Sequence, residues 1–341
     1  MSLIKLLRKS NHKTLFTTPS HGQKFFIFNK FRQFYKYDIS ETETHNPQMA
    51  LSLVQERAKC IYGTKYTYFL TNGSTSGIIA SVLTCTKKGD KVLIWDKAHQ
   101  SHLNAVKLAG CNPVFYSIPI IKEWGIPNKI TPDIIDIKDV KAVIVTSPTY
   151  EGITSDISKL KEICAKNGAY LIVDEAHGAL YPFSNKLPDS AVNIADFIIQ
   201  SLHKTAGGLN PTALLHVNCD LDPQNALSMI NTTSPSYPLL ASIEANIKFL
   251  NSNKGRKKIE TIISKISNIR KNTKNVEFYG DDLTKILIKK EGLTGYELSK
   301  KLYDLFNIED EITNKTSTML LCGIGTSIKK LERLESALKR I

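Results

Sequence analysis

The chain has 341 residues, of which 42% are hydrophobic, so it can bury a sizeable core and is not globally disordered. It carries 45 Lys or Arg against 32 Asp or Glu, a formal charge of +13. No apolar run approaches the roughly 18 residues that cross a bilayer. The basic start also lacks the apolar stretch and cleavage site of a secretory signal, so we expect neither a membrane protein nor an exported one.

The positive charge is concentrated in two segments, residues 1–37 and 248–275. The first has eight basic residues and no acid, and the second has nine basic residues and one acid. The second segment also repeats isoleucine at helical spacing, at Ile259, Ile262, Ile263, Ile266 and Ile269. This pattern predicts a packed helix with a solvated basic face. A nucleic-acid or membrane surface is the less favoured interpretation of these charges.

The six cysteines are scattered along the chain, and none of them forms a CxxC pair. Neither a zinc site nor a disulfide framework is indicated. Isolated thiols among apolar residues are typical of a reducing compartment, so we expect a cytoplasmic protein.

The predicted elements begin with an amphipathic helix that packs Leu3, Leu6 and Leu7. From about residue 66, short β-branched or aromatic runs alternate with helical stretches. The predicted strands are Tyr66–Leu70, Lys91–Trp95, Pro113–Tyr116, Ala142–Thr146, Tyr170–Asp174, Phe197–Ser201 and Ala213–Val217. The helices predicted among them are Ile78–Leu83, Ser101–Leu108 and Ile157–Lys166. This alternation predicts an α/β fold with a mostly parallel sheet covered by helices on both faces.

After about residue 240 the pattern changes to a long helical stretch followed by shorter elements. These are Lys285–Ile288, Gly295–Phe306, Thr318–Cys322 and Ser327–Arg340. We therefore predict an N-terminal arm over residues 1–45, a large domain over 46–245 and a small α/β domain over 246–341.

Four polar segments follow predicted strands, where ligands bind in sheets of this kind. The first is Thr71–Gly77, in which Gly73 permits a tight turn. Ser74 and Thr75 place hydroxyls beside the free amides of a helix N-terminus. The segment predicts either a phosphate cradle or a plain N-cap.

The second polar segment, Asp96–His102, contains His99 and His102. Two histidines at a strand terminus could ligate a metal ion, but no carboxylate or thiol completes such a set. We therefore expect a capping or stacking histidine and no metal.

The third and fourth polar segments are Val173–Gly178 and Gln200–Gly208. Asp174 closes one buried strand, where it would act either as a structural ion-pair partner or as a functional acid. Lys204 follows the next strand, and most lysines are solvated surface charges. The thirty residues that separate Asp174 from Lys204 suit neighbouring strands of the sheet.

Together the four segments predict a site for pyridoxal 5′-phosphate (PLP). This cofactor needs a lysine that binds its aldehyde and an acid that keeps its ring nitrogen protonated. It also needs a helix N-terminus with hydroxyls for the phosphate, and a flat side chain against the ring. Ser74, Thr75, His99, Asp174 and Lys204 supply these groups in chain order. Each motif alone is weak evidence, whereas the set is specific.

The sequence resembles the Orn/Lys/Arg decarboxylases, which are fold type I PLP enzymes. The matching motifs are Thr18–His21, Asp38–Glu41, His45–Pro47, Thr71–Gly77, Ser147–Gly152, Asp174–Ala179, Ser201–Thr205, Leu215–Val217 and Thr232–Tyr237. They run in family order through about residue 245, and the remainder resembles the small domain of the family. Ser20 replaces a usual glycine, and the stretch between Glu41 and His45 is shorter than in the family.

The resemblance implies roles for individual residues. Lys204 would bind the cofactor covalently, Asp174 would pair with the ring nitrogen, and His99 and Ala176 would pack on the two ring faces. His177 would lie near the ring hydroxyl. The residues implied at the phosphate are Gly73, Ser74, Thr75, Ser201 and His203, with Thr232 reaching the phosphate of a neighbouring subunit.

The implied activity is decarboxylation of arginine, lysine or ornithine to a polyamine-type amine, in an obligate homodimer with shared active sites. His99 or the freed Lys204 would return the proton to Cα. Because the sequence stops at Ile341, we expect it to lack the C-terminal domain of the family.

Two other functions remain open. The segments DEAHG and HKTAGG also resemble the α-oxoamine synthases, although TSPSY and SPTYEG argue against that reaction. A degenerate PLP-binding regulatory subunit is the alternative outside enzymes, and its support is the expected lack of the C-terminal domain.

Overall fold

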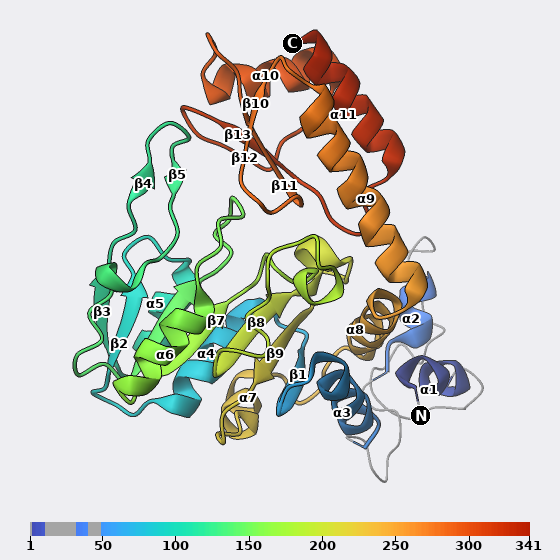
Figure 1. Cartoon of the computed structure of the whole chain (residues 1–341). Helices are drawn as coiled ribbons and strands as arrows, with labels where there is room; N and C mark the ends of the chain where they lie inside the picture. The colour runs from blue at the N-terminus through green and yellow to red at the C-terminus, as the bar shows by residue number, and fades with distance from the viewer. Residues whose placement is uncertain (1, 11–31, 40–48) are drawn as a thin grey trace.

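The computed structural model describes residues 2–10, 32–39 and 49–341, which form two units, each built on a sheet (Figure 1). The motifs Thr18–His21 and His45–Pro47 and the second half of Asp38–Glu41 lie outside the described residues. Most of the predicted N-terminal arm lies outside them as well.

The larger unit is built on a seven-stranded sheet. Its strands are β1 (Tyr66–Leu70), β2 (Lys91–Trp95), β3 (Asn112–Tyr116), β6 (Ala142–Thr146), β7 (Tyr170–Asp174), β8 (Phe197–Ser201) and β9 (Ala213–Val217). They lie in the order β1-β9-β8-β7-β6-β2-β3. Strand β9 runs antiparallel to β1 and β8, and the other neighbours are parallel. The prediction of a mostly parallel sheet is confirmed.

Helices cover both faces of this sheet because its strands are apolar on both sides (Figure 1). In β6, Val143 and Val145 face one core, whereas Ile144 faces the other. The helices of this unit are α3 (Met49–Tyr62), α4 (Gly73–Cys85), α5 (Gln100–Leu108), α6 (Ile157–Lys166), α7 (Gln224–Ile230) and α8 (Tyr237–Leu250). Helices α4, α5 and α7 contribute to the Ile144 core, and α3, α6 and α8 to the opposite one.

The smaller unit has a four-stranded antiparallel sheet of order β10-β11-β13-β12. Its elements are α9 (Asn253–Asn272), β10 (Glu277–Tyr279), β11 (Lys285–Lys289), α10 (Gly295–Phe306), β12 (Ile312–Thr313), β13 (Thr318–Leu321) and α11 (Ile328–Arg340). The isoleucine stripe of α9 is buried along its whole length, and most of the basic residues of this helix are exposed on its outer side. This confirms the amphipathic helix predicted there.

The remaining described elements are short. They are α1 (Leu3–Ser10), α2 (Arg32–Tyr37), and a hairpin of β4 (Ile120–Ile121) and β5 (Ile126–Pro127). Leu3, Leu6 and Leu7 of α1 are buried, as predicted. Among the described residues, no helix is both long enough and apolar enough to cross a bilayer.

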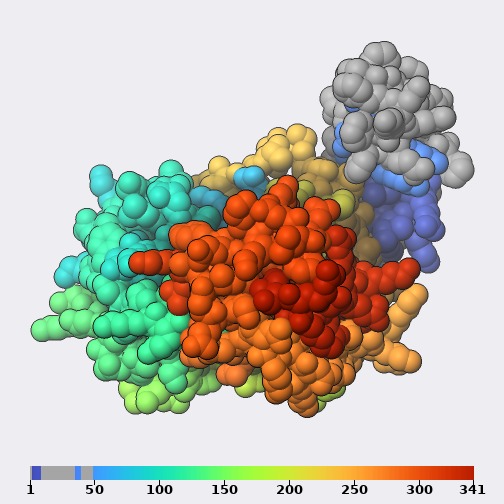
Figure 2. All heavy atoms as spheres, turned by 90° about the horizontal axis from the view of Figure 1, so that it is seen from above, coloured from blue at the N-terminus to red at the C-terminus, as the bar shows by residue number. Residues whose placement is uncertain are grey.

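Seen from above, the smaller unit lies over the larger one (Figure 2). The β4–β5 hairpin reaches it, and the ring of Trp124 stacks on Tyr279 with centroids 5.1 Å apart. The Ser317 hydroxyl donates to the Trp124 carbonyl at 2.8 Å. The Ile324 amide, after β13, donates to the Thr205 carbonyl at 2.8 Å, next to Lys204. The smaller unit therefore meets the large sheet where β7 and β8 end.

Candidate active site

Asp174 and Lys204 lie at the carboxyl ends of two neighbouring strands. Strand β7 ends at Asp174 and pairs in parallel with β8. Lys204 lies in a π-helical turn, Leu202–Ala206, that directly follows β8 and ends at Gly207 with φ of 85°. A positive φ favours glycine, which allows the chain to turn sharply away from the lysine. The adjacent strands predicted from sequence are thus observed.

Asp174 is a buried carboxylate with well-defined partners. Its Oδ2 accepts a hydrogen bond from His102 Nε2 at 2.9 Å, and its Oδ1 accepts one from the Ala176 amide at 3.1 Å. Burial alone would raise the pKa of Asp174, but the His102 bond and charge, the Lys204 charge and the Ala176 amide together hold it below its ordinary value. The carboxylate therefore stays ionised and can hold a positively charged ring nitrogen.

Lys204 Nζ lies 2.9 Å from Nε2 of His177. Burial lowers the pKa of Lys204, and the positive charge of Lys285 lowers it further, against the opposing charges of Asp174 and Glu311. A larger share of this amine is therefore neutral near pH 7 than in a surface lysine. Only the neutral amine can attack a carbonyl carbon, so this lysine suits covalent chemistry.

His177 is buried between Lys204 and the Tyr150 ring, whose centroid lies 4.4 Å from its own. Burial, together with the nearby lysine charges, sets the pKa of His177 well below its ordinary value, so the ring is neutral. Its Nδ1 has no hydrogen-bond partner among the described residues. A bound polar group would satisfy this atom.

The predicted phosphate cradle is open to a ligand. Helix α4 begins at Gly73, which has φ of 75°, and the Asn72 side chain makes no capping bond. The first amides of α4, beside Ser74 and Thr75, therefore lack the side-chain acceptor that normally caps a helix. Free amides and hydroxyls of this kind suit an anion, and the phosphate site predicted here stays a prediction.

Ser201 and His203, the other residues predicted at the phosphate, lie at the end of β8 and in the turn that follows it. The Ser201 side chain is fully buried, and its Oγ has no hydrogen-bond partner within the described chain. His203 Nδ1 donates to the Thr212 carbonyl at 3.0 Å, which leaves Nε2 available to a ligand. A buried hydroxyl without a partner is costly unless a ligand completes it.

His99 caps helix α5, as one of the two sequence interpretations proposed. Its Nδ1 accepts from the Ser101 amide at 3.2 Å and lies 2.8 Å from the Ser101 hydroxyl. Burial lowers the pKa of His99, so the neutral ring predominates near pH 7. Within the described ranges, no cluster of His, Cys, Asp or Glu has the composition of a metal site.

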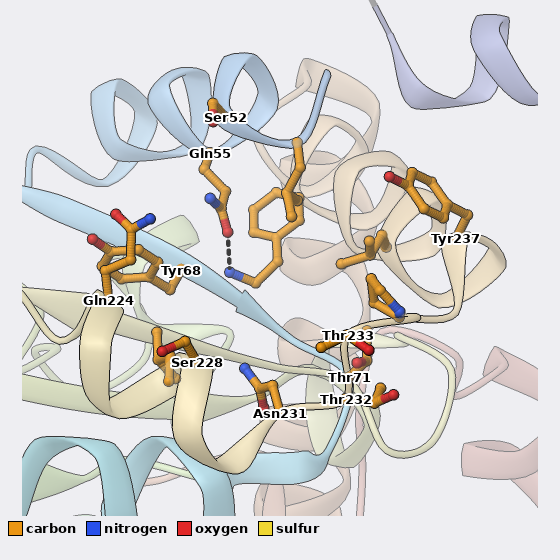
Figure 3. Close-up of a pocket in the computed structure, with 15 residues that line it drawn as sticks. Ser52, Gln55, Tyr68, Thr71, Gln224, Ser228, Asn231, Thr232, Thr233 and Tyr237 are labelled. Atoms are coloured by element: carbon orange, nitrogen blue, oxygen red, sulfur yellow. Dashed lines mark hydrogen bonds between the residues drawn. The ribbon is translucent and has the colours of Figure 1, made fainter. Parts of the chain in front are cut away.

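Thr232 lies apart from these groups, beside a cavity of about 370 Å³ between α3, β1, α7 and the start of α8. Thr71, Thr232 and Thr233 come together at one end of this cavity (Figure 3). The Thr232 hydroxyl accepts from the Ser234 amide at 3.2 Å. Thr232 is exposed. Its contact with a second subunit stays a prediction.

Sequence reasoning missed three groups around this site. His102 was seen only as a capping or metal-binding residue, yet it contacts Asp174. Glu311 accepts a hydrogen bond from the Tyr150 hydroxyl at 2.5 Å, and Lys285 donates to the His177 carbonyl at 3.3 Å. The last two come from the smaller unit, and no sequence motif links them to the strand ends.

Comparison with known proteins identifies the family. A family model for the major domain of Orn/Lys/Arg decarboxylases matches residues 3–287. The chain belongs to this family. Arginine decarboxylase from Bacillus subtilis is 30% identical over 97% of this chain and 75% of its own length. Arginine decarboxylase from Halalkalibacterium halodurans is 29% identical over 88% of this chain and 66% of its own length.

The fold agrees with this assignment. The crystal structure of a lysine decarboxylase from Francisella novicida matches with a TM-score of 0.87 at 18% sequence identity. The match covers 99% of this chain and 59% of that one. The fold is thus that of the fold type I PLP enzymes, and family membership classes the chain as a PLP-dependent amino acid decarboxylase.

The observed groups fit PLP. The uncapped start of α4 and the unpartnered Ser201 hydroxyl suit a phosphate, and the ionised Asp174 suits a protonated ring nitrogen. Lys204 supplies an amine with a lowered pKa, and the unpartnered Nδ1 of His177 suits a polar substituent of the ring. No other pair of neighbouring strand ends in the described chain combines these groups.

Proposed function

We propose that this chain decarboxylates a basic amino acid, arginine, lysine or ornithine, and releases the corresponding amine and carbon dioxide. The observation that carries this proposal is the position of two groups at the ends of adjacent strands. One is the buried, ionised Asp174, and the other is Lys204, whose pKa is lowered. In a member of this family, that pair supplies the acid and the amine that PLP needs.

The proposed residue roles follow from these positions. Lys204 holds PLP covalently, and Asp174, fixed by His102, keeps the ring nitrogen protonated. His99 and Ala176 pack against the ring, and His177 bonds a ring substituent. The phosphate is held by the α4 amides with Gly73, Ser74, Thr75, Ser201 and His203.

When bound, PLP supplies a ring that takes up the electrons of the Cα–carboxylate bond as carbon dioxide leaves. Asp174 makes this possible because its negative charge stabilises the protonated ring nitrogen. A proton must then return to the substrate's Cα, and His99 and Lys204 are the two candidate donors. The buried His177 keeps Lys204 oriented toward the site.

The position of Glu311 favours a substrate that has a positively charged side chain. The exposed Glu311 carboxylate accepts a hydrogen bond from Tyr150, whose ring centroid lies 4.4 Å from that of His177. His177 in turn contacts Lys204, so Glu311 lies on the rim of this site. The Tyr150 hydroxyl orients this carboxylate. We infer that Glu311 accepts the guanidinium or ammonium group of the substrate, because a charged acceptor binds such groups most strongly.

We further propose a cytoplasmic homodimer that serves polyamine synthesis. In it, the exposed Thr232 of each subunit would reach the phosphate of the other.

The activity can be tested with the purified chain loaded with PLP. Each of L-arginine, L-lysine and L-ornithine is incubated with it, and carbon dioxide and the amine product are measured. We expect equal amounts of both products from one of the three amino acids and none from L-leucine. A PLP-loaded protein that releases no carbon dioxide from any of them would instead be the regulatory subunit. Release of coenzyme A from an acyl thioester would identify an α-oxoamine synthase.

A further inference from the structure

Lys285 and Asp282 form a buried ion pair where the two units meet. Each side chain is 1% exposed, and Lys285 Nζ lies 3.0 Å from Asp282 Oδ2. Lys285 also donates to the Thr284 hydroxyl at 2.8 Å and to the His177 carbonyl at 3.3 Å. Lysines are almost never buried this completely without a partner, and burying two charges is costly. The burial of this ion pair therefore calls for a functional explanation.

Asp282 is held in place by donors besides Lys285. Its Oδ1 accepts from the Thr284 amide at 2.8 Å and the Thr284 hydroxyl at 2.6 Å. Its Oδ2 also accepts from the Tyr181 hydroxyl at 2.8 Å. These donors hold the Asp282 carboxylate in one position, directly against the Lys285 side chain.

Two lysines therefore converge on one histidine from different sides. Lys204 contacts the imidazole of His177, whereas Lys285 contacts its backbone carbonyl. Lys285 has a carboxylate in direct contact, but in the described chain Lys204 forms no ion pair within 4.0 Å. Because two ammonium groups repel each other in a buried site, the nearby Lys285 ammonium lowers the pKa of Lys204.

The backbone at Gly152 packs closely against the Lys285 side chain. A side chain on Gly152, which has φ of 91°, would place Cβ 2.7 Å from Lys285 Cγ. The SPTYEG segment, which carries Tyr150, thus packs directly on this lysine. Lys285 therefore contacts the two loops that surround Lys204.

We propose that Lys285 is a positioning residue of the active site. Its side chain, held against Asp282, anchors the His177 backbone and so positions the imidazole that contacts the Lys204 amine, and it places a second lysine beside that amine. This rests on the proposed function of Lys204 as the lysine that binds PLP.

Other titratable groups also surround the two lysines. Asp174 and Glu311 act on Lys204 in the direction opposite to Lys285. His177 and His99 are neutral, because burial lowers the pKa of both. Around Lys285, Tyr181 is neutral because burial raises its pKa, and Arg270 binds the Lys285 carbonyl at 3.0 Å.

The test measures how reactive Lys204 is in the full chain freed of PLP. Lysines are labelled with acetic anhydride at several pH values, and mass spectrometry follows the Lys204 peptide. In Lys285→Met we expect labelling at pH 8 to fall about threefold to tenfold, as expected when a nearby cation is removed. Lys289→Met is the matched control, because Lys289 lies on the same strand but pairs with Glu277. We expect it to leave labelling of Lys204 unchanged.

A further variant distinguishes the effect of the Lys285 charge on Lys204 from the effect of Lys285 packing. Lys285→Arg keeps the cation but disturbs the close fit, so we expect it to retain Lys204 labelling within twofold. An equal fall in Lys285→Met and Lys285→Arg, or no fall in Lys285→Met, would overturn the proposal. If Lys285→Met does not fold, the double variant Lys285→Met, Asp282→Asn removes both charges and must show a smaller fall in the same direction.

The function of Lys204 is checked separately by loading PLP, reducing with borohydride and finding the modified peptide. Modification of another lysine would refute the proposed function, while the labelling result would still decide the effect of Lys285 on Lys204.

Discussion

The two sheets of this protein carry different kinds of polar groups. In the seven-stranded sheet, Asp174 ends one strand and Lys204 follows the end of the parallel strand beside it. In the four-stranded antiparallel sheet, the core is apolar, and the buried charges Asp282 and Lys285 lie at the junction with the larger unit. Parallel strands bring their ends to one edge, whereas antiparallel strands do not.

This difference suggests different roles for the two units. In the proposed function, the larger unit supplies Asp174 and Lys204, the groups that would bind the cofactor. The smaller unit supplies Glu311 and Lys285, which we propose act on substrate binding and on Lys204. Changes on the large sheet should therefore abolish turnover, and changes on the small sheet should modify it.

The largest effect is expected for Asp174→Ala. Without this carboxylate the ring nitrogen loses its counter-charge, so turnover should fall by about a thousandfold or more. Carbon dioxide release measures this. Asp136→Ala, an exposed acid on a loop of the same unit, should keep full activity. An Asp174→Ala protein with normal turnover would contradict the assignment of the site.

A smaller loss is expected for His102→Leu. This change leaves the buried carboxylate of Asp174 without its main donor and raises its pKa, so turnover should fall roughly tenfold to a hundredfold. His102→Gln retains an N–H donor and should stay within a few-fold of the wild type. If both variants lose the same activity, the histidine acts by packing and not by holding the acid.

Glu311→Gln tests the contribution of the smaller unit. Losing the charge should raise KM for the basic amino acid about tenfold, with a smaller change in kcat, because the contact is to a remote part of the substrate. Steady-state kinetics measure this. Glu309→Gln, an exposed neighbour on the same loop, is the control. An unchanged KM would place the recognition of the substrate cation elsewhere.

The mildest effect concerns stability and involves Glu175 on the large sheet. Burial raises its pKa from an ordinary 4.5 to about 7, although the Ala191 amide, Gln200 and Ser190 all donate to it. The folded protein then binds a proton that the unfolded chain has lost. Stability should therefore fall as pH rises from about 4.5 to 7, by on the order of 3 kcal/mol.

Glu175→Gln should remove this pH dependence. Thermal melts between pH 5 and 8 would show a flatter Tm profile for it, whereas exposed Glu162→Gln should match the wild type. A profile as steep in Glu175→Gln as in the wild type would mean that another group titrates.

Much of the fold could be predicted because its strands are short apolar runs bounded by helices. The strands Lys91–Trp95, Ala142–Thr146 and Phe197–Ser201 have the predicted bounds. The same regularity located Asp174 and Lys204 at neighbouring strand ends. Sequence patterns are local, and they succeed where local order decides the position of a side chain.

The contacts that were missed join residues far apart in the chain. His102 faces Asp174 because α5 packs against the sheet, and its spacing alone could not choose between capping and this pairing. Lys285 and Glu311 reach the site only through the docking of the smaller unit. Such docking depends on the packing of whole surfaces, which no motif records.

The most direct test of this account is the visible absorbance of the purified chain loaded with PLP, compared with Lys204→Ala. The account predicts a yellow, lysine-bound band in the wild type that shifts when one basic amino acid is added, and no such band in Lys204→Ala. An identical band in both proteins, or a wild-type chain that takes up no PLP, would contradict it.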